Sequence, residues 1–579
     1  MAKVASMITP TPTDDATLTR RYADFDTLVD AVEYAAKGVR GMNFYDARGN
    51  LYNSMTWRET RDKAEAVGRK LVAMGFEKND RIALIAETTA EFIVFFLGCQ
   101  YASVLPVPLP LPTSFGAKDG YIVQLQNQMN SCQANAIMAP SYMTELVTDG
   151  SKGMGLRFIG SLEDYLAHEG DAEVRLPTVD DLAYLQYSSG STRFPHGVSV
   201  THTSLLSNTY GMGFHGVRLG DGDRCVSWLP FYHDMGLVGM FLTSLCCQVS
   251  VDFLATEDFA RRPITWLKIM SRNKGTCSYS PTFGYEICAR RVRSDALAEL
   301  DLSSWRVAGN GGDMIRPEVM SKFHEAFKDV GFSDKSFVPS YGLAECTLAV
   351  SFAEVGKGLE VDLVDESLLG GDTHVLVSGT EDTERQRSVV NCGKPLPEFD
   401  VEIRNTEDKA LPERYVGRVF VKGVSVMRDY YNDPASTADV LKDGWLDTGD
   451  MGYMLEGCIY IVGRAKDMII VNGKNHWPQD IEWAAEQVEG MRNGDVAAIS
   501  VPGENNEELP MILAHCRFSD PVERAKFAEL LKKHVMSITG VTCLVELVAP
   551  RSLPRTSSGK LSRAKARSEY LDGKLKLAG

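Results

Sequence analysis

The hydrophobic pattern in the first part of the chain alternates between short apolar runs and longer amphipathic stretches. Residues 81–85, 104–109 and 136–138 are short apolar runs, which is typical of strands buried on both faces of a parallel sheet. Between them, helices are expected over about 88–103, with Thr88 as a candidate cap, and over 122–132. This alternation, with a period of roughly 25 residues, predicts an α/β architecture with a mostly parallel sheet.

The same pattern resumes further along and then changes character. Apolar runs at 224–229, 249–254, 277–279 and 305–308 continue the predicted sheet. After about residue 390, short strand-like runs separated by Gly and Pro turns predict a small β-barrel or a distorted sheet. From about residue 467, helices and strands alternate again over roughly 110 residues, which is the size of one small domain.

Composition places the chain among ordinary globular proteins and excludes several classes of function. It has 579 residues, of which 44% are hydrophobic and 24% charged, and about 150 residues per domain suggests three or four units. With 61 basic and 77 acidic residues the formal net charge is −16, which argues against nonspecific binding to nucleic acid or to an anionic membrane. The most apolar run, 92–111, is interrupted by Gln100, Ser103 and prolines. We therefore expect a buried helix and a short strand there, and no integral membrane segment.

The cysteines and the N-terminus favour a cytoplasmic setting. The 12 cysteines are scattered and form no C-x-x-C pair, so neither a disulfide framework nor a zinc site is expected. Residues 1–14 are polar and lack a basic flank followed by an apolar core, so no signal peptide is predicted there.

A loop rich in hydroxyls and glycine, residues 187–197, lies between two apolar runs. Its sequence, Tyr-Ser-Ser-Gly-Ser-Thr-Arg-Phe-Pro-His-Gly, offers hydroxyl and backbone N–H donors that suit a polyphosphate. A Ser/Gly-rich surface turn explains the same residues equally well. A second glycine-rich stretch, 211–216, fits G-x-G-x-x-G, but it follows a predicted helix and not a strand, so we reject a dinucleotide fingerprint.

Two further stretches combine aromatic and acidic residues. Residues 228–236, Trp-Leu-Pro-Phe-Tyr-His-Asp-Met-Gly, form a turn that either carries chemistry or packs a domain edge. Residues 341–346, Tyr-Gly-Leu-Ala-Glu-Cys, offer a ring that could stack on a base and a carboxylate that could hold a divalent cation. A strand-to-helix turn with a capping Glu is the alternative for the second stretch.

Three polar turns occur in the last third of the chain. The carboxylate of Asp450, in 444–450, could accept hydrogen bonds from ribose hydroxyls or could form an Asx turn. Residues 463–467 are either an interdomain hinge or a solvated loop. Lys560, at the end of Pro-Arg-Thr-Ser-Ser-Gly-Lys, would on its own be taken for a surface lysine.

Taken in order, these motifs resemble the adenylate-forming superfamily, which includes acyl-CoA synthetases, nonribosomal peptide adenylation domains and luciferases. The resemblance extends from about residue 27 to 563. It rests on six motifs in the family's order: 187–197, 228–236, 341–345, 447–450, 463–467 and 559–560. It implies an α/β fold with a large N-terminal region, a small β-barrel-like subdomain and a small mobile C-terminal α+β domain.

Within the superfamily the chain most resembles the fatty acyl-AMP ligases. Arg193 stands where acyl-CoA synthetases usually have Gly, and His196 stands where they usually have Lys. The second departure removes a usual phosphate-contacting lysine. Residues 356–388 form a long segment before the Gly393 turn. The resemblance implies that this insertion packs against the C-terminal domain and restrains the rotation that would build a site for CoA.

The resemblance also implies roles for individual residues. The catalytic residues would be Lys560, His233 and Glu345, with Glu345 coordinating Mg²⁺. The ATP and AMP site would consist of Ser188, Ser189, Gly190, Ser191, Thr192, Gly311, Gly312, Asp313, Tyr341, Gly342, Asp450 and Arg464. The hinge would be Lys466 and Asp467. The acyl pocket would be lined by Trp228, Pro230, Met235, Gly236, Pro281, Thr282 and Phe283, although plain core explains most of these apolar segments as well.

These roles imply a domain plan and a reaction. Residues 1–463 would form the adenylation domain, with an insertion at 355–390 and a β-rich subdomain at about 390–463. Residues 464–467 would be the hinge and 468–579 the lid. The enzyme would use ATP and Mg²⁺ to convert a fatty acid into its acyl-adenylate, with release of pyrophosphate.

The acyl group would then pass to the phosphopantetheine of a separate acyl carrier protein, or to a carrier domain of a polyketide, nonribosomal peptide or lipid pathway. We expect a separate acceptor because the sequence shows no carrier-domain serine motif. An acyl-CoA ligase and a catalytically inactive adenylate-binding scaffold are the alternatives.

Overall fold

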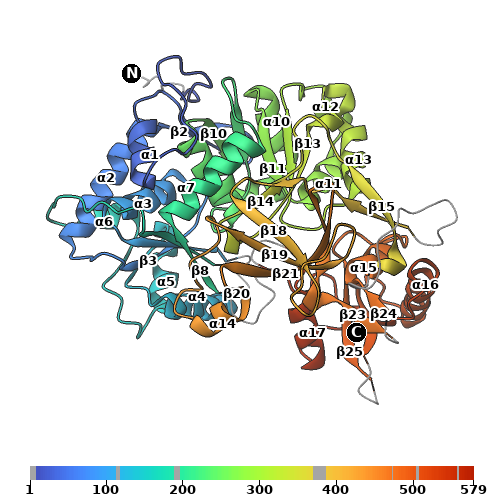
Figure 1. Ribbon diagram of the computed structural model, residues 1–579. Helices are drawn as coiled ribbons and strands as arrows, with labels where there is room; N and C mark the ends of the chain where they lie inside the picture. Colours follow the sequence, from blue (N-terminus) through green and yellow to red (C-terminus); the bar gives the residue numbers. More distant parts are fainter. Residues whose placement is uncertain are drawn as a thin grey trace.

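The computed structural model describes residues 8–112, 118–187, 196–369, 386–471, 474–503, 508–556 and 560–578 (Figure 1). Within these residues the largest sheet has nine strands in the order β17-β14-β13-β12-β11-β9-β10-β1-β2. The run from β13 to β1 is parallel, and the outer strands pair antiparallel. The strands are β1 (Gly41–Tyr45), β2 (Leu51–Thr56), β9 (Arg224–Ser227), β10 (Ser250–Leu254), β11 (Cys277–Ser280), β12 (Val307–Asn310), β13 (Phe337–Gly342), β14 (Ala349–Phe352) and β17 (Lys394–Pro395).

A second, wholly parallel sheet has the order β4-β3-β5-β6 in the described part of the chain. Its strands are β3 (Arg81–Ile85), β4 (Leu105–Leu109), β5 (Ala136–Met138) and β6 (Phe158–Gly160). Helix α3 (Ala90–Tyr101) is buried at every residue except Glu91, as its predominantly apolar sequence predicts. The predicted cap Thr88 is wrong by one residue: Thr89 has the extended backbone of a cap, and its side chain accepts the N–H of Phe92.

Helices surround these two sheets. They are α1 (Leu28–Ala35), α2 (Trp57–Ala73), α3, α4 (Lys118–Cys132), α5 (Thr144–Gly150), α6 (Leu162–Leu166), α7 (His202–Tyr210), α8 (Thr243–Cys246), α9 (Thr256–Arg261), α10 (Ile264–Arg272), α11 (Thr282–Arg291), α12 (Ser294–Leu297) and α13 (Pro317–Phe327). The hairpin of β7 (Leu182–Tyr187) and β8 (Gly197–Thr201) borders the hydroxyl-rich loop, and residues 188–195 of that loop lie outside the described residues.

The change in hydrophobic pattern near residue 390 corresponds to the start of an antiparallel sheet. It is formed by β18 (Phe399–Arg404), β19 (Gly417–Gly423), β20 (Leu441–Lys442), β21 (Trp445–Leu455) and β22 (Cys458–Arg464), with α14 (Pro434–Val440) beside β20. Register shifts interrupt the β19–β21 and β21–β22 pairs, so the distorted sheet is the alternative that the structure supports. A separate hairpin, β15 (Val361–Asp365) with β16 (Gln386–Val390), precedes it in the chain.

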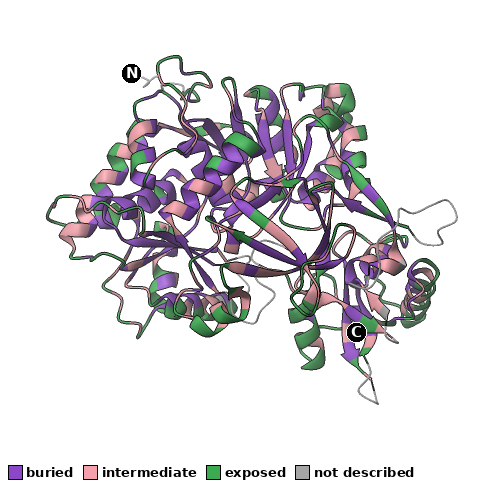
Figure 2. Ribbon diagram, in the orientation of Figure 1, coloured by how far each residue is buried: buried purple, intermediate pink, exposed green. Residues whose placement is uncertain are grey.

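The C-terminal part of the chain builds its own small core at the lower right of Figure 1. Strands β25 (Val496–Pro502), β26 (Glu508–His515) and β27 (Leu544–Val548) form one sheet, and β23 (Ile469–Val471) pairs with β24 (Lys474–His476). Helices α15 (Pro478–Glu486), α16 (Pro521–Thr539) and α17 (Arg563–Leu571) complete this part. In Figure 2 its strands are largely buried, whereas α16 and α17 expose much of their surface.

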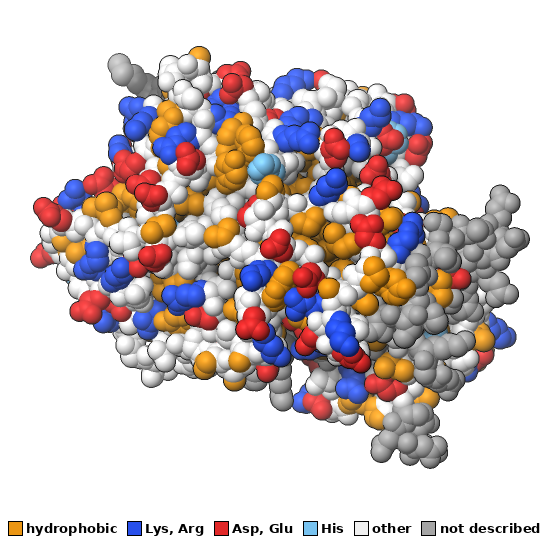
Figure 3. Space-filling model, viewed as in Figure 1, with side chains coloured by type: hydrophobic (Ala, Val, Ile, Leu, Met, Phe, Trp, Pro, Cys, Tyr) orange, Lys and Arg blue, Asp and Glu red, His pale blue; other side chains and the backbone are white. Residues whose placement is uncertain are grey.

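Aromatic side chains form part of the main hydrophobic core. The Trp228 ring stacks on Phe259 with centroids 3.8 Å apart, and Trp266 meets Trp305 edge to face at 5.2 Å. Truncating one such ring to alanine typically costs about 3–5 kcal/mol of stability. On the face shown in Figure 3, acidic and basic side chains are interspersed. Among the described helices, none combines the length and the hydropathy needed to cross a bilayer.

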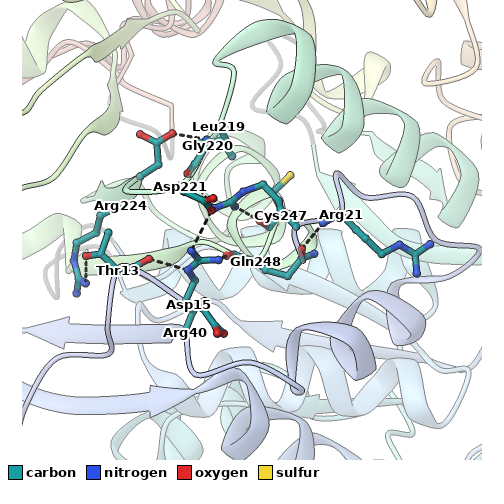
Figure 4. A network of polar contacts seen from close by, with 12 residues as sticks. Thr13, Asp15, Arg21, Arg40, Leu219, Gly220, Asp221, Arg224, Cys247 and Gln248 are labelled. Carbon is teal, nitrogen blue, oxygen red and sulfur yellow. Dashed lines mark hydrogen bonds and ion pairs between the residues drawn. The ribbon is translucent and has the colours of Figure 1, made fainter. Parts of the chain in front are cut away.

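A buried polar network ties the N-terminal segment to the large sheet (Figure 4). Arg40 donates to the carbonyl oxygens of Thr13 at 2.8 Å and Gln248 at 3.0 Å. Arg224 donates to both carboxylate oxygens of Asp252, at 2.6 and 2.7 Å. Both side chains of this ion pair are almost fully buried, so each depends on the other for its charge to be compensated.

Candidate active site

One cavity brings together residues that are far apart in the sequence. Its polar end is formed by the turn that carries His233, the C-terminal end of β13 with Tyr341, the short helix η7 (Ala344–Cys346) with Glu345, and two cationic side chains, Arg464 and Lys560. The carboxyl ends of parallel strands are where ligands usually bind in such folds. The structure therefore gathers the three predicted catalytic residues in one place.

The predicted nucleoside contacts lie where this cavity meets a second one: Tyr341 and Arg464 line both, and Asp450 lines the second. The hydroxyl of Tyr341 donates to Asp450 Oδ2 at 2.8 Å. Arg464 Nε lies 3.2 Å from Asp450 Oδ1, because the two residues are cross-strand partners on β21 and β22. Burial raises the pKa of Asp450, although Arg464 favours its charged form. A carboxylate held in this way can accept hydrogen bonds from the hydroxyls of a ribose.

Glycines allow the chain to pass closely beside these contacts. Gly312, beside Gly311 and Asp313, has φ +76°, a conformation that favours glycine. A side chain at Gly342 would collide with the carbonyl oxygen of Leu348. Gly342 therefore permits the close approach of β13 to the chain at Leu348, and Gly312 permits the turn beside Met235 and Lys560.

Glu345 is a carboxylate at the polar end of the cavity. Its Oε1 accepts the hydroxyl of Tyr430 at 2.9 Å. Tyr430 packs on the ring of His196, with centroids 4.7 Å apart, and His196 Nδ1 lies 3.1 Å from Asp433. The ring of Tyr430 therefore connects His196 to Glu345. Burial raises the pKa of Glu345, while Tyr430 and Arg464 favour the carboxylate.

This single carboxylate fits Mg²⁺ that arrives with a nucleotide. Such ions are usually held by one or two carboxylates together with phosphate oxygens and water, and not by a protein cage. Among the described residues there is no cluster of three or more His, Cys, Asp or Glu side chains that could hold a metal ion. Ser188, Ser189, Gly190, Ser191 and Thr192, predicted to hold the phosphates, lie outside the described residues.

Lys560 enters the cavity from the C-terminal part of the chain. Its backbone is fixed by Thr556, whose N–H donates to the Lys560 carbonyl oxygen at 2.7 Å. Its Nζ lies 3.7 Å from the point that a Cβ on Gly312 would occupy. Burial lowers the pKa of Lys560, although Asp313, Asp234 and Asp450 favour the ammonium. A cation in such a partly desolvated position interacts strongly with an approaching anion.

The predicted hinge residues lie at the junction of the two parts. Strand β22 ends at Arg464, and Lys466 and Asp467 belong to the short helix η9 (Ala465–Asp467). Asp467 accepts from Arg563 at 2.9 Å, and Arg563 also binds Glu482 of α15. The role of these residues as a hinge stays a prediction.

The predicted acyl-pocket residues fall into three groups. Met235 lines the cavity beside His233, and Gly236 packs against the carbonyl oxygen of Pro230. Trp228 belongs to the aromatic core, and Pro281 stands at the start of α11. The remaining two, Thr282 and Phe283, lie on a second cavity that faces the C-terminal part of the chain.

Two stretches that from the sequence could also supply apolar tunnel lining, 238–245 and 279–284, contribute Met240 and Tyr279 to the first cavity. This cavity has an apolar extension. It is lined by Met212, Val217, Leu219, Cys225, Met240, Cys277, Tyr279, Ala349 and Phe352. Met212 belongs to the stretch that fits G-x-G-x-x-G, which follows α7 directly as a π-helix, η3 (Gly211–Gly216). A π-helix inside a longer helix is a frequent mark of a functional site, but it cannot be read from the sequence.

The hairpin β15–β16 reaches helix α15. Arg387 on β16 lies 3.2 Å from Asp480 and donates to the carbonyl oxygen of Val462 at 2.9 Å. From the other side, Arg316 donates to Glu486 of α15 at 2.8 Å. The ring of Trp483 lies within 6 Å of both guanidinium groups. These contacts hold α15 against the rest of the molecule.

Comparison with known proteins agrees with this geometry. The family described as "AMP-binding enzyme" matches residues 33–431. The chain belongs to this family. A Caulobacter vibrioides protein named "Putative acyl-CoA synthetase" is 46% identical over 99% of both chains. The medium-chain-fatty-acid–[acyl-carrier-protein] ligase JamA of Moorena producens is 32% identical, over 95% of this chain and 96% of JamA.

A solved structure extends the likeness to three dimensions. It comes from structural and functional studies of fatty acyl-adenylate ligases from E. coli and L. pneumophila, and it matches with a TM-score of 0.91 and 44% identity. The match covers 96% of this chain and 99% of that one. The predicted superfamily, the resemblance to fatty acyl-AMP ligases and the α/β fold class are thereby confirmed.

Proposed function

We propose that this AMP-binding enzyme activates a fatty acid as its acyl-adenylate and hands the acyl group to a carrier thiol. The observation that carries the proposal is the position of Lys560, which reaches the cavity that also holds Glu345, His233 and Tyr341. A cation there meets the reacting carboxylate and the α-phosphate where both converge.

The residue types suit this chemistry. A fatty-acid carboxylate attacks the α-phosphorus of ATP, and pyrophosphate leaves. Two anions must approach each other, so the Lys560 ammonium stabilises the negative charge that builds up between them. Tyr341, Asp450 and Arg464 hold the adenosine. Glu345 would hold Mg²⁺, which when bound neutralises phosphate charge.

The apolar extension supports a fatty acid as the substrate. It begins beside His233 and Met235 and continues past Met212 to Cys277. A chain of methylenes placed there leaves water, at a gain of about 0.8 kcal/mol for each buried CH₂. An apolar lining of this kind provides few hydrogen-bond partners for a substrate with a polar or charged side chain.

The contact between Arg387 and Asp480 favours a carrier thiol over CoA. By family resemblance, the lid must rotate to build a CoA site, and the β15–β16 hairpin holds α15 in its present place. We propose residues 464–467 as the hinge, 468–579 as the lid and the cytoplasm as the compartment. The acyl-CoA ligase alternative keeps the support of the C. vibrioides relative's name.

Incubation with ATP, Mg²⁺, mixed fatty acids and CoA tests the proposal. We expect pyrophosphate release and an acyl-adenylate detectable by mass spectrometry, with little acyl-CoA. Substantial acyl-CoA would favour the ligase alternative. A lack of pyrophosphate release with every fatty acid would favour an inactive adenylate-binding scaffold.

A further inference from the structure

His233 and its neighbour Asp234 form a dyad at the polar end of the cavity. His233 Nδ1 lies 2.6 Å from Asp234 Oδ1, and the same oxygen accepts the backbone N–H of Met235 at 2.8 Å. Burial alone would raise the pKa of Asp234, but His233 and Lys560 hold it below its ordinary value. The Met235 N–H also lies 3.3 Å from His233 Nδ1, but its contact with Asp234 is shorter, and so is the 2.6 Å contact between Nδ1 and the carboxylate. A carboxylate only accepts hydrogen bonds, so we assign the proton to Nδ1 and leave Nε2 as the basic nitrogen.

The dyad lies where the acyl carbonyl must be. His233 shares the cavity with Lys560, and Met235 adjoins both residues: its Sδ and Lys560 Nζ lie 2.7 and 3.7 Å from the same point over Gly312. The charged groups that surround the dyad from other elements are Glu345, Arg464 and Lys560, with Asp313 and Asp450 next to Lys560.

The first half-reaction gives such a base nothing to do. A fatty-acid carboxyl group is already ionised at neutral pH, so its attack on ATP moves no proton. The second half-reaction differs, because a thiol reacts as the thiolate and ordinarily loses its proton only near pH 8.5. A histidine fixed by a carboxylate is the usual device for removing such a proton near neutral pH.

We propose that His233, oriented by Asp234, is the general base for thiol attack on the acyl-adenylate. Sulfur forms a bond to the acyl carbon, the bond between that carbon and the phosphate oxygen breaks, and AMP leaves with the electron pair. The thiol proton passes to His233 Nε2. This inference rests on the proposed function and assigns His233 as a catalytic residue and Asp234 as a positioning residue.

The test separates the two half-reactions. Wild type and the variants His233→Gln and Asp234→Asn are each loaded with the acyl-adenylate that the wild type makes, and transfer to excess pantetheine is followed in a single turnover between pH 6 and 9. Loss of a general base typically costs 100- to 10,000-fold. We expect His233→Gln to slow transfer by at least roughly 100-fold and to lose the wild-type pH dependence. Adenylate formation, measured as pyrophosphate release, should fall by a much smaller factor.

Asp234→Asn should also slow transfer, because an amide can donate to Nδ1 and leave the proton on Nε2. Glu257→Gln is the control, because Glu257 is an exposed carboxylate of α9 that pairs with Arg261 and does not line the cavity; its transfer should keep the wild-type rate and pH dependence.

Equal losses in both half-reactions, an unchanged pH profile in His233→Gln, or no transfer by the wild type would overturn the inference. A wild type that forms no adenylate would instead overturn the proposed function.

Discussion

Lys560 is the residue of the site whose role we expect no other side chain to take over. Its ammonium is the cationic group that the C-terminal part contributes to the polar end of the described cavity, opposite Tyr341 and Glu345. Arg464, the other cationic residue that lines the cavity, forms an ion pair with Asp450. Substitution at Lys560 should therefore affect the reaction more than the binding of ATP.

Lys560→Ala should slow adenylation by about 100- to 1000-fold, which corresponds to roughly 2.7–4 kcal/mol of transition-state stabilisation. The affinity for ATP should change little, because Tyr341 and Asp450 still hold the nucleoside. ATP–pyrophosphate exchange and equilibrium ATP binding measure the two effects. Near-wild-type exchange would show that Lys560 is not catalytic.

The pH dependence of adenylation should reflect the same side chain. Burial lowers the pKa of Lys560, and the charged form is the active one. Activity should therefore fall as pH rises through a value below the ordinary 10.4 or so of lysine. Lys560→Arg keeps its charge throughout this range, so it should lose this alkaline decline in exchange assays. An unchanged decline would assign it to another group.

The hairpin β15–β16 is one of the elements that contact the C-terminal part. Arg387 is 6% exposed, and its partner Asp480 is a buried carboxylate whose pKa is raised by burial. Removing one partner of a buried ion pair leaves an uncompensated charge. The contact between hairpin and α15 should therefore weaken more than the loss of one surface contact would suggest.

Arg387→Ala should increase acyl-CoA formation from ATP, fatty acid and CoA by several-fold, because α15 is released. Lys409→Ala is the control, since Lys409 is exposed and pairs only locally with Glu407. Liquid chromatography of acyl-CoA products gives the readout. If both variants form as little acyl-CoA as the wild type, the hairpin does not set the choice of acceptor.

Met212 of the π-helix η3 is buried and lines the apolar extension that we propose as the acyl path. Met212→Ala should lengthen the cavity and shift the adenylates formed from a mixed fatty-acid pool toward longer chains. Met212→Phe should shift them toward shorter ones. Mass spectrometry of the adenylates reports the distribution. Met320→Ala, a buried methionine of α13, should lower stability without shifting chain length.

The whole molecule depends on buried ionic contacts that join distant segments. Asp252→Ala would leave the Arg224 guanidinium buried without its carboxylate, at a cost of about 3–5 kcal/mol. The midpoint of denaturant unfolding should fall accordingly, whereas ATP affinity of the folded protein should not. Replacing both partners with leucine and methionine should recover most of the loss. If the double variant is no more stable than Asp252→Ala, the loss does not come from the uncompensated charge.

Much of the fold could be predicted because parallel strands covered on both faces have a strong local signature. The run 81–85 coincides with β3, and the run 136–138 coincides with β5. Boundaries were less secure: Tyr341, predicted to follow a strand, lies within β13. Strand ends are decided by neighbouring strands, which a local pattern does not contain.

The site shows a similar division. The order of the motifs was enough to predict Lys560, His233, Glu345 and Asp450 as site residues, because each lies within a short sequence motif that is typical of the family. Asp234, Arg387 and Met212 were not given roles, because their roles depend on contacts. The role of Asp234 follows from the side-chain orientation of its neighbour His233. That of Arg387 follows from the position of α15, and that of Met212 from the π-helix.

By itself, the sequence determined the α/β class, the order of the motifs and the chemistry that their residue types can perform. Each of these depends on local pattern or on residue identity. Only the tertiary structure decided that Lys560 lies beside Gly312, that β15–β16 lies against α15, and that an apolar path extends from His233 to Cys277. These facts follow from packing between segments separated by hundreds of residues, and no local preference encodes them.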